Sequence, residues 1–227
     1  MIVRLPRLLH RWNVGPARAI AIQRDLASRV IISKLPSPVR LVAGLDATFT
    51  RDEKWCIASV VLWDLQDQAA VEQHVQRRRL AFPYVPGLLS FREAPALLAA
   101  IGKLRVRPDV LMCDGQGFAH PRRFGVACHV GVLTGLPSLG CAKSILVGEH
   151  GVLRTARGSK SPLMDGGERV GTVLRTRDGV NPVYVSIGHR IDLPGAEEVV
   201  LRCSSRFRLP EPTRLAHQLC SKARSTT

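Results

Sequence analysis

The run Leu41-Val42-Ala43-Gly44-Leu45-Asp46-Ala47-Thr48-Phe49 is apolar except for Thr48 and one carboxylate, Asp46. Apolar runs of this length, bounded by polar segments, are typical of strands with both faces covered. Two further strand-like runs follow at residues 56–63 and 69–80. Only the short polar segments 50–55 and 64–68 separate the three runs, and such connections join antiparallel neighbours. The sequence therefore predicts an antiparallel meander of three strands.

Helical and strand-like segments alternate after the meander. We expect a helix through residues 95–101, an apolar strand over 109–113, a helix over 124–134 and a strand over 137–142. The resulting order is β-β-β-α-β-α-β. Crossover helices pack on the faces of the sheet whose strands they connect. The prediction is an α/β fold, a mixed sheet with helices on both faces.

The remaining segments extend this core at both ends. Pro16 opens a helical pattern with Ile22, Leu26 and Val30 on one stripe, and Leu35-Pro36-Ser37-Pro38 ends it. The tail predicts a hairpin of strands 168–175 and 183–187, followed by helices near 195–204 and 212–221. We expect residues 1–15 to form an irregular arm and residues 16–227 to form a single domain.

The chain carries a large positive charge. It has 33 Lys+Arg against 18 Asp+Glu, which gives +15, and its pI is about 10.7. Such a surface attracts phosphate backbones or an anionic membrane, and nucleic acid is the expected partner. No apolar stretch reaches the ~18 residues of a membrane span. The six cysteines lack C-x-x-C spacing, which indicates buried thiols in a reducing compartment. We predict a cytoplasmic protein with no membrane contact.

Three carboxylates occupy positions that suggest a metal site. Asp46 lies in an apolar strand, Asp114 ends the apolar strand 109–113, and Glu93 lies at the entry to the first crossover helix. An all-oxygen site suits Mg²⁺ or Mn²⁺. Each residue has an ordinary alternative. Asp46 could pair with an arginine, Asp114 could cap a turn, and Glu93 could close a capping box with Ser90.

A glycine-rich basic loop follows Asp114. Gly115 and Gly117 allow a backbone to approach a ligand closely, and His120, Arg122 and Arg123 could bind phosphate oxygens. The alternative is a solvated basic loop. Lys143 ends the next apolar strand, where its charge would face a cleft, although a snorkelling surface lysine is equally ordinary.

The longer motifs resemble those of the endonuclease V family. The matching segments span nearly the whole chain, from about residue 16 to 220: Tyr84-Val85-Pro86-Gly87-Leu88-Leu89-Ser90-Phe91-Arg92-Glu93, Asp114-Gly115-Gln116-Gly117 with His120-Pro121-Arg122-Arg123, Gly140-Cys141-Ala142-Lys143, Pro162-Leu163-Met164-Asp165, Tyr184-Val185-Ser186-Ile187-Gly188-His189 and Pro210-Glu211-Pro212-Thr213-Arg214-Leu215-Ala216-His217. The resemblance implies a ribonuclease-H-like fold. It also implies hydrolysis of the second phosphodiester bond 3′ to a deaminated base, chiefly hypoxanthine, leaving a 5′-phosphate at the nick.

The resemblance also implies roles for individual residues. Asp46, Glu93 and Asp114 would hold Mg²⁺, with Mn²⁺ as a substitute, and His217 would stand in the fourth position. Lys143 and His120 would lie near the scissile phosphate. The other expected contacts with nucleic acid come from two loops: Pro83, Tyr84 as a wedge, and Gly87 in the first; Gly115, Gln116, Gly117, Arg122 and Arg123 in the second.

One residue and two alternative activities leave the substrate open. Gln116 stands where some relatives of this family carry His or Asn, which puts the range of lesions in question. Action mainly on inosine-containing RNA is one alternative to DNA repair, with the 2′-hydroxyl as the discriminating group. A non-catalytic lesion-binding protein is another, and the carboxylates at 46, 93 and 114 argue against it. We expect the protein to be a monomer.

Overall fold

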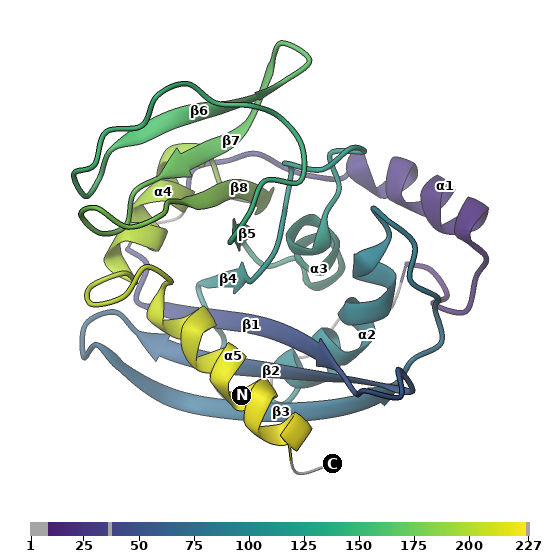
Figure 1. Ribbon diagram of the computed structural model, residues 1–227. Coiled ribbons are helices and arrows are strands. Elements are labelled where there is room, and N and C mark those ends of the chain that lie inside the picture. The colour runs from purple at the N-terminus through teal and green to yellow at the C-terminus, as the bar shows by residue number, and fades with distance from the viewer. Residues whose placement is uncertain (1–8, 36–37, 226–227) are drawn as a thin grey trace.

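The structure is a computed structural model that describes residues 9–35 and 38–225. An eight-stranded sheet runs through it in the order β3-β2-β1-β4-β5-β8-β7-β6 (Figure 1). The strands are β1 (Leu41–Phe49), β2 (Trp55–Asp64), β3 (Ala69–Arg79), β4 (Val110–Cys113), β5 (Ser138–Ala142), β6 (Lys160–Asp165), β7 (Glu168–Leu174) and β8 (Val183–His189). The helices are α1 (Pro16–Ala27), α2 (Leu89–Ile101), α3 (Val126–Thr134), α4 (Leu193–Arg202) and α5 (Glu211–Ser225).

The strand pairing has the topology that the sequence predicts. β1, β2 and β3 form an antiparallel meander. α2 and α3 are the crossovers that lead to β4 and β5, which run parallel to β1 and to β4 respectively. The β-β-β-α-β-α-β core of a ribonuclease-H-like fold is confirmed. The predicted tail hairpin is also present, as β7 paired antiparallel with β8.

Helices cover both faces of the sheet, as the sequence predicts. Side chains alternate between the faces along a strand. Ala43 and Leu45 of β1 are fully or almost fully buried in the core formed with α2 and α3. Val42 faces the other way, into a second core that includes α4. On this second side α5 lies across β1 and β2 (Figure 1).

The expected start of α2 was wrong. Pro95 removes a backbone donor and argues against a helix through that position. The structure nevertheless has an unbroken helix from Leu89, with Pro95 inside it. Burial of Leu97 and Ile101 on one side of the helix and of Phe91 on another offsets the lost hydrogen bond, since each large apolar side chain contributes about 1.5–3 kcal/mol.

Two other boundaries differ from the prediction. The first helix ends at Ala27, well before the proline-rich segment expected to end it, and residues 36 and 37 of that segment lie outside the described residues. β6 was not predicted because Pro162 is unusual in a strand. It is tolerated there because β6 is at the edge of the sheet, where no further partner needs its N–H.

The cysteines, the helices and the N-terminal segment test three further predictions from the sequence. All six cysteines are free and buried. No helix in the described ranges is long and apolar enough to cross a membrane. Of the predicted irregular arm, residues 1–8 lie outside the described residues, and 9–15 contain no helix or strand. Trp12 of this segment packs against the core.

Candidate active site

Four polar side chains converge where β1 and β4 lie side by side. Asp46 Oδ2 lies 2.9 Å from His217 Nδ1, and Asp114 Oδ2 lies 2.5 Å from Lys143 Nζ. One ligand atom from each of Asp46, Asp114 and His217 lies within 4.8 Å of the other two. Carboxylate and imidazole groups at this spacing form a donor set for a divalent cation. We call these three residues the metal cluster.

Parallel strand pairing brings the two aspartates together. β1 and β4 are in register with Leu45 opposite Cys113, so Asp46 and Asp114 are the next residues on neighbouring strands. The Asp114 N–H donates to the Leu45 carbonyl oxygen at 2.9 Å, which fixes the chain where β4 ends. Two residues far apart in the sequence therefore share one site.

A close approach of α5 to the sheet brings His217 to the cluster. A Cβ on Gly44 would lie 2.2 Å from the carbonyl carbon of Pro212, so only glycine allows this spacing. The Ser59 hydroxyl of β2 donates to the Ala216 carbonyl oxygen at 2.7 Å and holds the helix in place. Neither contact is visible in a local sequence pattern.

The charges of the site favour a bound cation. Burial raises the pKa of the Asp46 carboxyl, and the negative charge of Asp114 raises it further, against the hydrogen bond from His217. Burial, with the charges of Asp46 and Asp114, raises the pKa of Glu93 to about 8. Close carboxylates penalise one another's ionised forms, and a divalent cation relieves that penalty. The residues therefore fit a divalent metal ion.

The ordinary alternatives for the three carboxylates do not hold in the structure. Asp46 bonds His217 rather than an arginine, and Asp114 pairs with Lys143. The N-cap of α2 is Leu88, so Ser90 and Glu93 form no capping box. Glu93 is nevertheless not a member of the metal cluster, and its place as a ligand stays a prediction.

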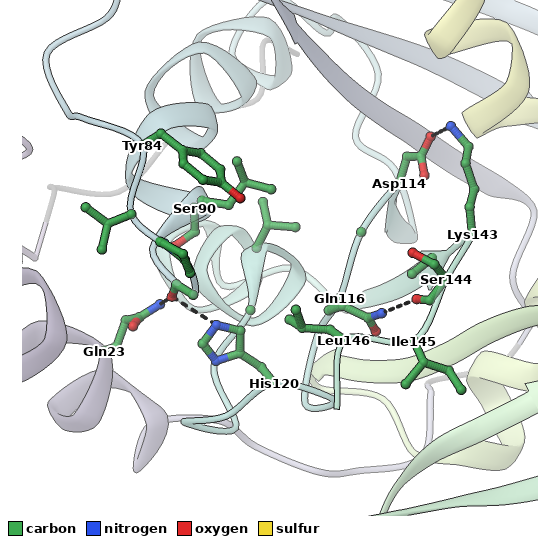
Figure 2. Close-up of a pocket in the computed structure, with 18 residues that line it drawn as sticks. Gln23, Tyr84, Ser90, Asp114, Gln116, His120, Lys143, Ser144, Ile145 and Leu146 are labelled. Carbon is green, nitrogen blue, oxygen red and sulfur yellow. Dashed lines mark hydrogen bonds and ion pairs between the residues drawn. The ribbon is translucent and has the colours of Figure 1, made fainter. Parts of the chain in front are cut away.

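A pocket of about 390 Å³ lies directly beside the metal cluster (Figure 2). Asp114 and Lys143 belong to its wall as well as to the site just described. Its lining comes from five segments of the chain: Gln23 of α1; Tyr84, Val85, Pro86, Gly87, Leu89 and Ser90; Asp114, Gly115, Gln116 and His120; Gly125 and Val126; and Ala142, Lys143, Ser144, Ile145 and Leu146. We call it the base pocket, after the expectation from the sequence that these loops contact nucleic acid.

The segment after Asp114 forms one wall of the base pocket. Its N–H groups are mostly engaged: Gly115 donates to Cys113 O, and Gly117 donates to Ser186 Oγ, each at 2.9 Å. The Gln116 N–H has no acceptor among the described residues. Gln116 Nε2 donates to the Ser144 carbonyl oxygen at 2.9 Å and ties this segment to its neighbour in the wall, residues 142–146 (Figure 2).

His120 forms part of the opposite wall as a neutral imidazole. Its Nε2–H donates to the Gly87 carbonyl oxygen at 3.0 Å, and its Nδ1 accepts from the Arg122 N–H at 3.1 Å. Burial, and next the charge of Arg122, lowers the pKa of His120 to about 4. His120 thereby links the basic loop to the Tyr84–Gly87 loop.

Arg122 and Arg123 are engaged within the protein. Arg122 Nε donates to Gln23 Oε1 at 2.6 Å. Arg123 forms ion pairs with Asp165 and Glu168, both at 2.7 Å. Neither arginine lines the base pocket. Their contacts hold loops together, and their predicted contact with phosphate remains a prediction.

Apolar side chains line the mouth of the base pocket. Tyr84 is 68% exposed, Leu146 50%, Leu89 42% and Ile145 39%, although each belongs to the lining. Exposed apolar groups around a pocket mark a binding surface. Of the other predicted contact residues, Gly87, Gly115, Gln116 and His120 line the pocket, whereas Pro83 and Gly117 do not.

Several lining residues of this pocket were not predicted from the sequence, among them Gln23, Ser144, Ile145 and Leu146. Gln23 lies on α1, and only tertiary packing brings it to the site. A signal for Ile145 and Leu146 was available, because these two apolar residues follow Lys143-Ser144 in the connection after the strand, where exposure was the natural expectation.

Comparison with known proteins places the chain in a family. The model of the endonuclease V family matches residues 24–218. An endonuclease V from Roseiflexus castenholzii is 51% identical over 219 residues, which are 96% of this chain and 98% of the relative.

Solved structures agree with the sequence comparison. An endonuclease V structure from Streptomyces avermitilis has a TM-score of 0.91 and 40% identity, and covers 100% of this chain and 99% of its own. A Ciona intestinalis endonuclease V, in complex with DNA containing an inosine, has a TM-score of 0.80 and 24% identity, covering 92% and 98%. The last likeness concerns the fold. Together with the metal cluster, the matches over nearly the full length show that the chain belongs to the endonuclease V family and is an endonuclease.

Proposed function

We propose that the protein repairs DNA by cutting the strand near a deaminated base, with hypoxanthine as its main target. One observation carries the proposal: Asp114 belongs to both the base pocket and the metal cluster, and Lys143 of the pocket lining pairs with it. A base held in the pocket would therefore place the DNA strand to which it is attached beside the metal cluster. The Ciona intestinalis protein is in complex with DNA that contains an inosine, whose base is hypoxanthine.

The free N–H of Gln116 supports selection of hypoxanthine over adenine. Hypoxanthine carries an oxygen at C6, which accepts a hydrogen bond, whereas adenine carries an amino group, which donates. An adenine would place a donor against this N–H donor, and a mismatch of this kind discriminates strongly. Extrusion of the base costs least at a mispair, which adds selectivity. Tyr84, exposed at the pocket mouth, would fill the gap left in the stack.

The cut is a hydrolysis at the second phosphodiester bond 3′ to the lesion. Water attacks phosphorus, the bond to the 3′ oxygen breaks, and the nick carries a 3′-hydroxyl and a 5′-phosphate. Asp46 and Asp114 would hold Mg²⁺, or Mn²⁺ in its place, with Glu93 and His217 beside them. When bound, the ion supplies polarisation of the phosphate.

The chain's own residues supply the rest of the chemistry. The Lys143 ammonium, 2.5 Å from Asp114, stabilises negative charge that builds on the phosphate. The His217 Nδ1–H donates to Asp46, which leaves Nε2 with a lone pair to accept the proton of the attacking water. The His217 side chain is 53% exposed, so water reaches it.

A matrix of substrates tests this function. Labelled single strands and duplexes, of DNA and RNA, carry either inosine or adenosine at one position and are incubated with Mg²⁺, Mn²⁺ or a chelator. We expect nicking of inosine DNA at the second 3′ bond with either ion, and none with the chelator. Faster cutting of inosine RNA would assign the protein to RNA instead. Binding without cutting in every metal would contradict the proposal.

We further propose that the protein works as a monomer in the cytoplasm, as one domain over residues 16–227. The single continuous sheet and the large positive charge support these proposals. Sedimentation at working concentration tests the oligomeric state.

A further inference from the structure

We propose that a second basic site, formed by Arg51, Arg77 and Arg224, binds a backbone phosphate of the cleaved DNA strand on the 3′ side of the cut. These arginines line a hollow of about 590 Å³ together with Thr50, Asp52 and Ser225. We call it the arginine site. The inference rests on the proposed function, which fixes the direction of the strand.

The charge of the arginine site is uncompensated. Arg51, Arg77 and Arg224 form no ion pair with any other residue in the described ranges. Asp52, the one acid in the lining, is held by its own turn. It accepts from the Thr50 hydroxyl at 2.6 Å and pairs with Lys54 at 3.6 Å. Three unpaired guanidinium groups around one hollow favour an anion, and arginine suits phosphate.

Two of the guanidinium groups are held in position without losing their charge. The Arg77 guanidinium lies over the Trp55 ring, 4.4 Å from its centroid. Arg224 Nη1 donates to the Thr48 hydroxyl at 3.3 Å. Such contacts reduce the freedom of a long side chain and so reduce the entropy lost when a phosphate binds. The site is therefore ordered in advance of its ligand.

The arginine site lies on the same face of the molecule as the metal cluster. Asp46 and Thr48 are two residues apart on β1, so their side chains point to the same face. His217 and Arg224 are seven residues apart on α5, which is two helical turns. Two contacts therefore link the same strand and helix, Asp46 with His217 and Thr48 with Arg224.

Element geometry gives the spacing along the strand. From Asp46 to Thr50 is about 13 Å at the rise of a β-strand, and from His217 to Arg224 is about 10 Å at the rise of a helix. One DNA strand carries a phosphate every ~3.4 Å along its axis, so the arginine site lies about three to four nucleotides from the scissile phosphate. Asp114 belongs both to the metal cluster and to the lining of the base pocket, so the cluster adjoins the pocket, and we place it between the pocket and the arginine site.

The direction of the strand follows from this arrangement. A strand that leaves the base pocket passes the metal cluster and then reaches the arginine site. The proposed cut is 3′ to the lesion, so the strand beyond the cut is its 3′ arm. The phosphate in the arginine site belongs to that arm.

The test compares inosine duplexes that extend mainly 5′ or mainly 3′ of the lesion, with equal total length. Affinity is measured with the whole protein in Ca²⁺ at several salt concentrations. We expect Arg224→Gln and Arg77→Gln each to reduce the salt slope on the 3′-extended duplex by about 1. Binding to the 5′-extended duplex should be unchanged.

Arg107→Gln is the matched control. Arg107 is exposed and lies near the start of β4, at the opposite end of that strand from Asp114. Equal behaviour of Arg224→Gln and Arg107→Gln on both duplexes would overturn the arginine site. If Arg77→Gln unfolds because Trp55 loses its partner, Arg224→Gln alone decides the question. Failure of the wild-type protein to nick inosine DNA would instead overturn the proposed function.

Discussion

At the scale of single residues, buried carboxylates at the candidate site are costly to ionise in the metal-free protein, and a bound cation would offset that cost. Burial, and next the charges of neighbouring carboxylates, raises the pKa of Asp46 and of Glu93 and so raises the energy of their charged forms. In a structural ion pair, by contrast, each charge would stabilise the charged form of its partner. Lys143 offsets only part of the charge, because its side chain is 38% exposed and such pairs contribute little.

Asp114→Asn separates the functional role from a structural one. The substitution preserves shape but removes charge that holds the ion, so we expect nicking to fall by several orders of magnitude. Lesion binding in Ca²⁺ should largely survive, and the melting temperature of the metal-free protein should stay level or rise. Asp165→Asn is the control, because Asp165 also pairs with a basic side chain, Arg123, but lies outside the metal cluster. Normal nicking by folded Asp114→Asn protein would refute the assignment.

His120 connects the base pocket to stability at low pH. Its pKa is about 4 in the folded protein, against 6.5 for an unperturbed histidine. Between these values the unfolded chain binds the extra proton, so this contribution is complete above pH 6.5 and is lost as the pH falls toward 4. The shift corresponds to about 3 kcal/mol.

Denaturant unfolding between pH 4 and 7 measures this contribution. His120→Gln keeps a donor for Gly87 and does not titrate. Its free energy of unfolding should depend less steeply on pH, by up to ~1.4 kcal/mol per pH unit. His150→Gln, at an exposed position, should follow the wild-type curve. Identical pH dependence for wild type and His120→Gln would show that His120 is not held neutral.

At the scale of elements, the sequence predicted those strands and helices whose formation depends on a local apolar pattern. The apolar runs located β1, β2, β4 and β5, since burial on both faces leaves a clear signature. Pro162 concealed β6, and Pro95 misplaced the start of α2, because edge position and packing override proline's local preference. Asp46 was identifiable within an apolar strand, and Asp114 and Lys143 at the ends of two others. His217 was identifiable only through the family motifs, and Gln23 through neither, because these contacts form between distant segments.

The distance between β1 and α5 is the element-level property on which the site depends. Gly44→Ala would place a Cβ against the backbone of Pro212, and neither backbone can yield without moving α5. We expect a loss of roughly 1–3 kcal/mol in stability, as for other overpacked cores. His217 should also retreat from Asp46, with weaker metal binding and slower nicking.

Gly15→Ala is a suitable comparison, since a Cβ at Gly15 meets nothing within 4 Å. Thermal unfolding and the Mg²⁺ dependence of nicking are measured for both variants. Weaker metal dependence in Gly44→Ala alone would link the helix position to the site. Wild-type nicking in a destabilised Gly44→Ala protein would show that α5 need not approach β1 this closely.

At the scale of the whole molecule, affinity and selectivity have different physical sources. The +15 charge attracts every phosphate backbone alike. Most groups that line the base pocket are uncharged, among them Gln116, the neutral His120 and the apolar side chains at the mouth, whereas the charged Asp114 and Lys143 pair with each other. Salt screens the first source and leaves the second almost untouched. Binding strength should therefore depend on salt, whereas preference for the lesion should not.

This separation gives a prediction for matched duplexes with and without inosine, measured by anisotropy in a chelator. Log affinity for the undamaged duplex should fall linearly with log salt, with a slope near −0.9 for each phosphate contacted. The inosine duplex should fall with the same slope, so the ratio of the two affinities stays constant. A flat response for both would remove the electrostatic argument. A ratio that shrinks as salt rises would mean that a charged side chain reads the base, and Lys143, the cation in the pocket lining, would be the first to substitute.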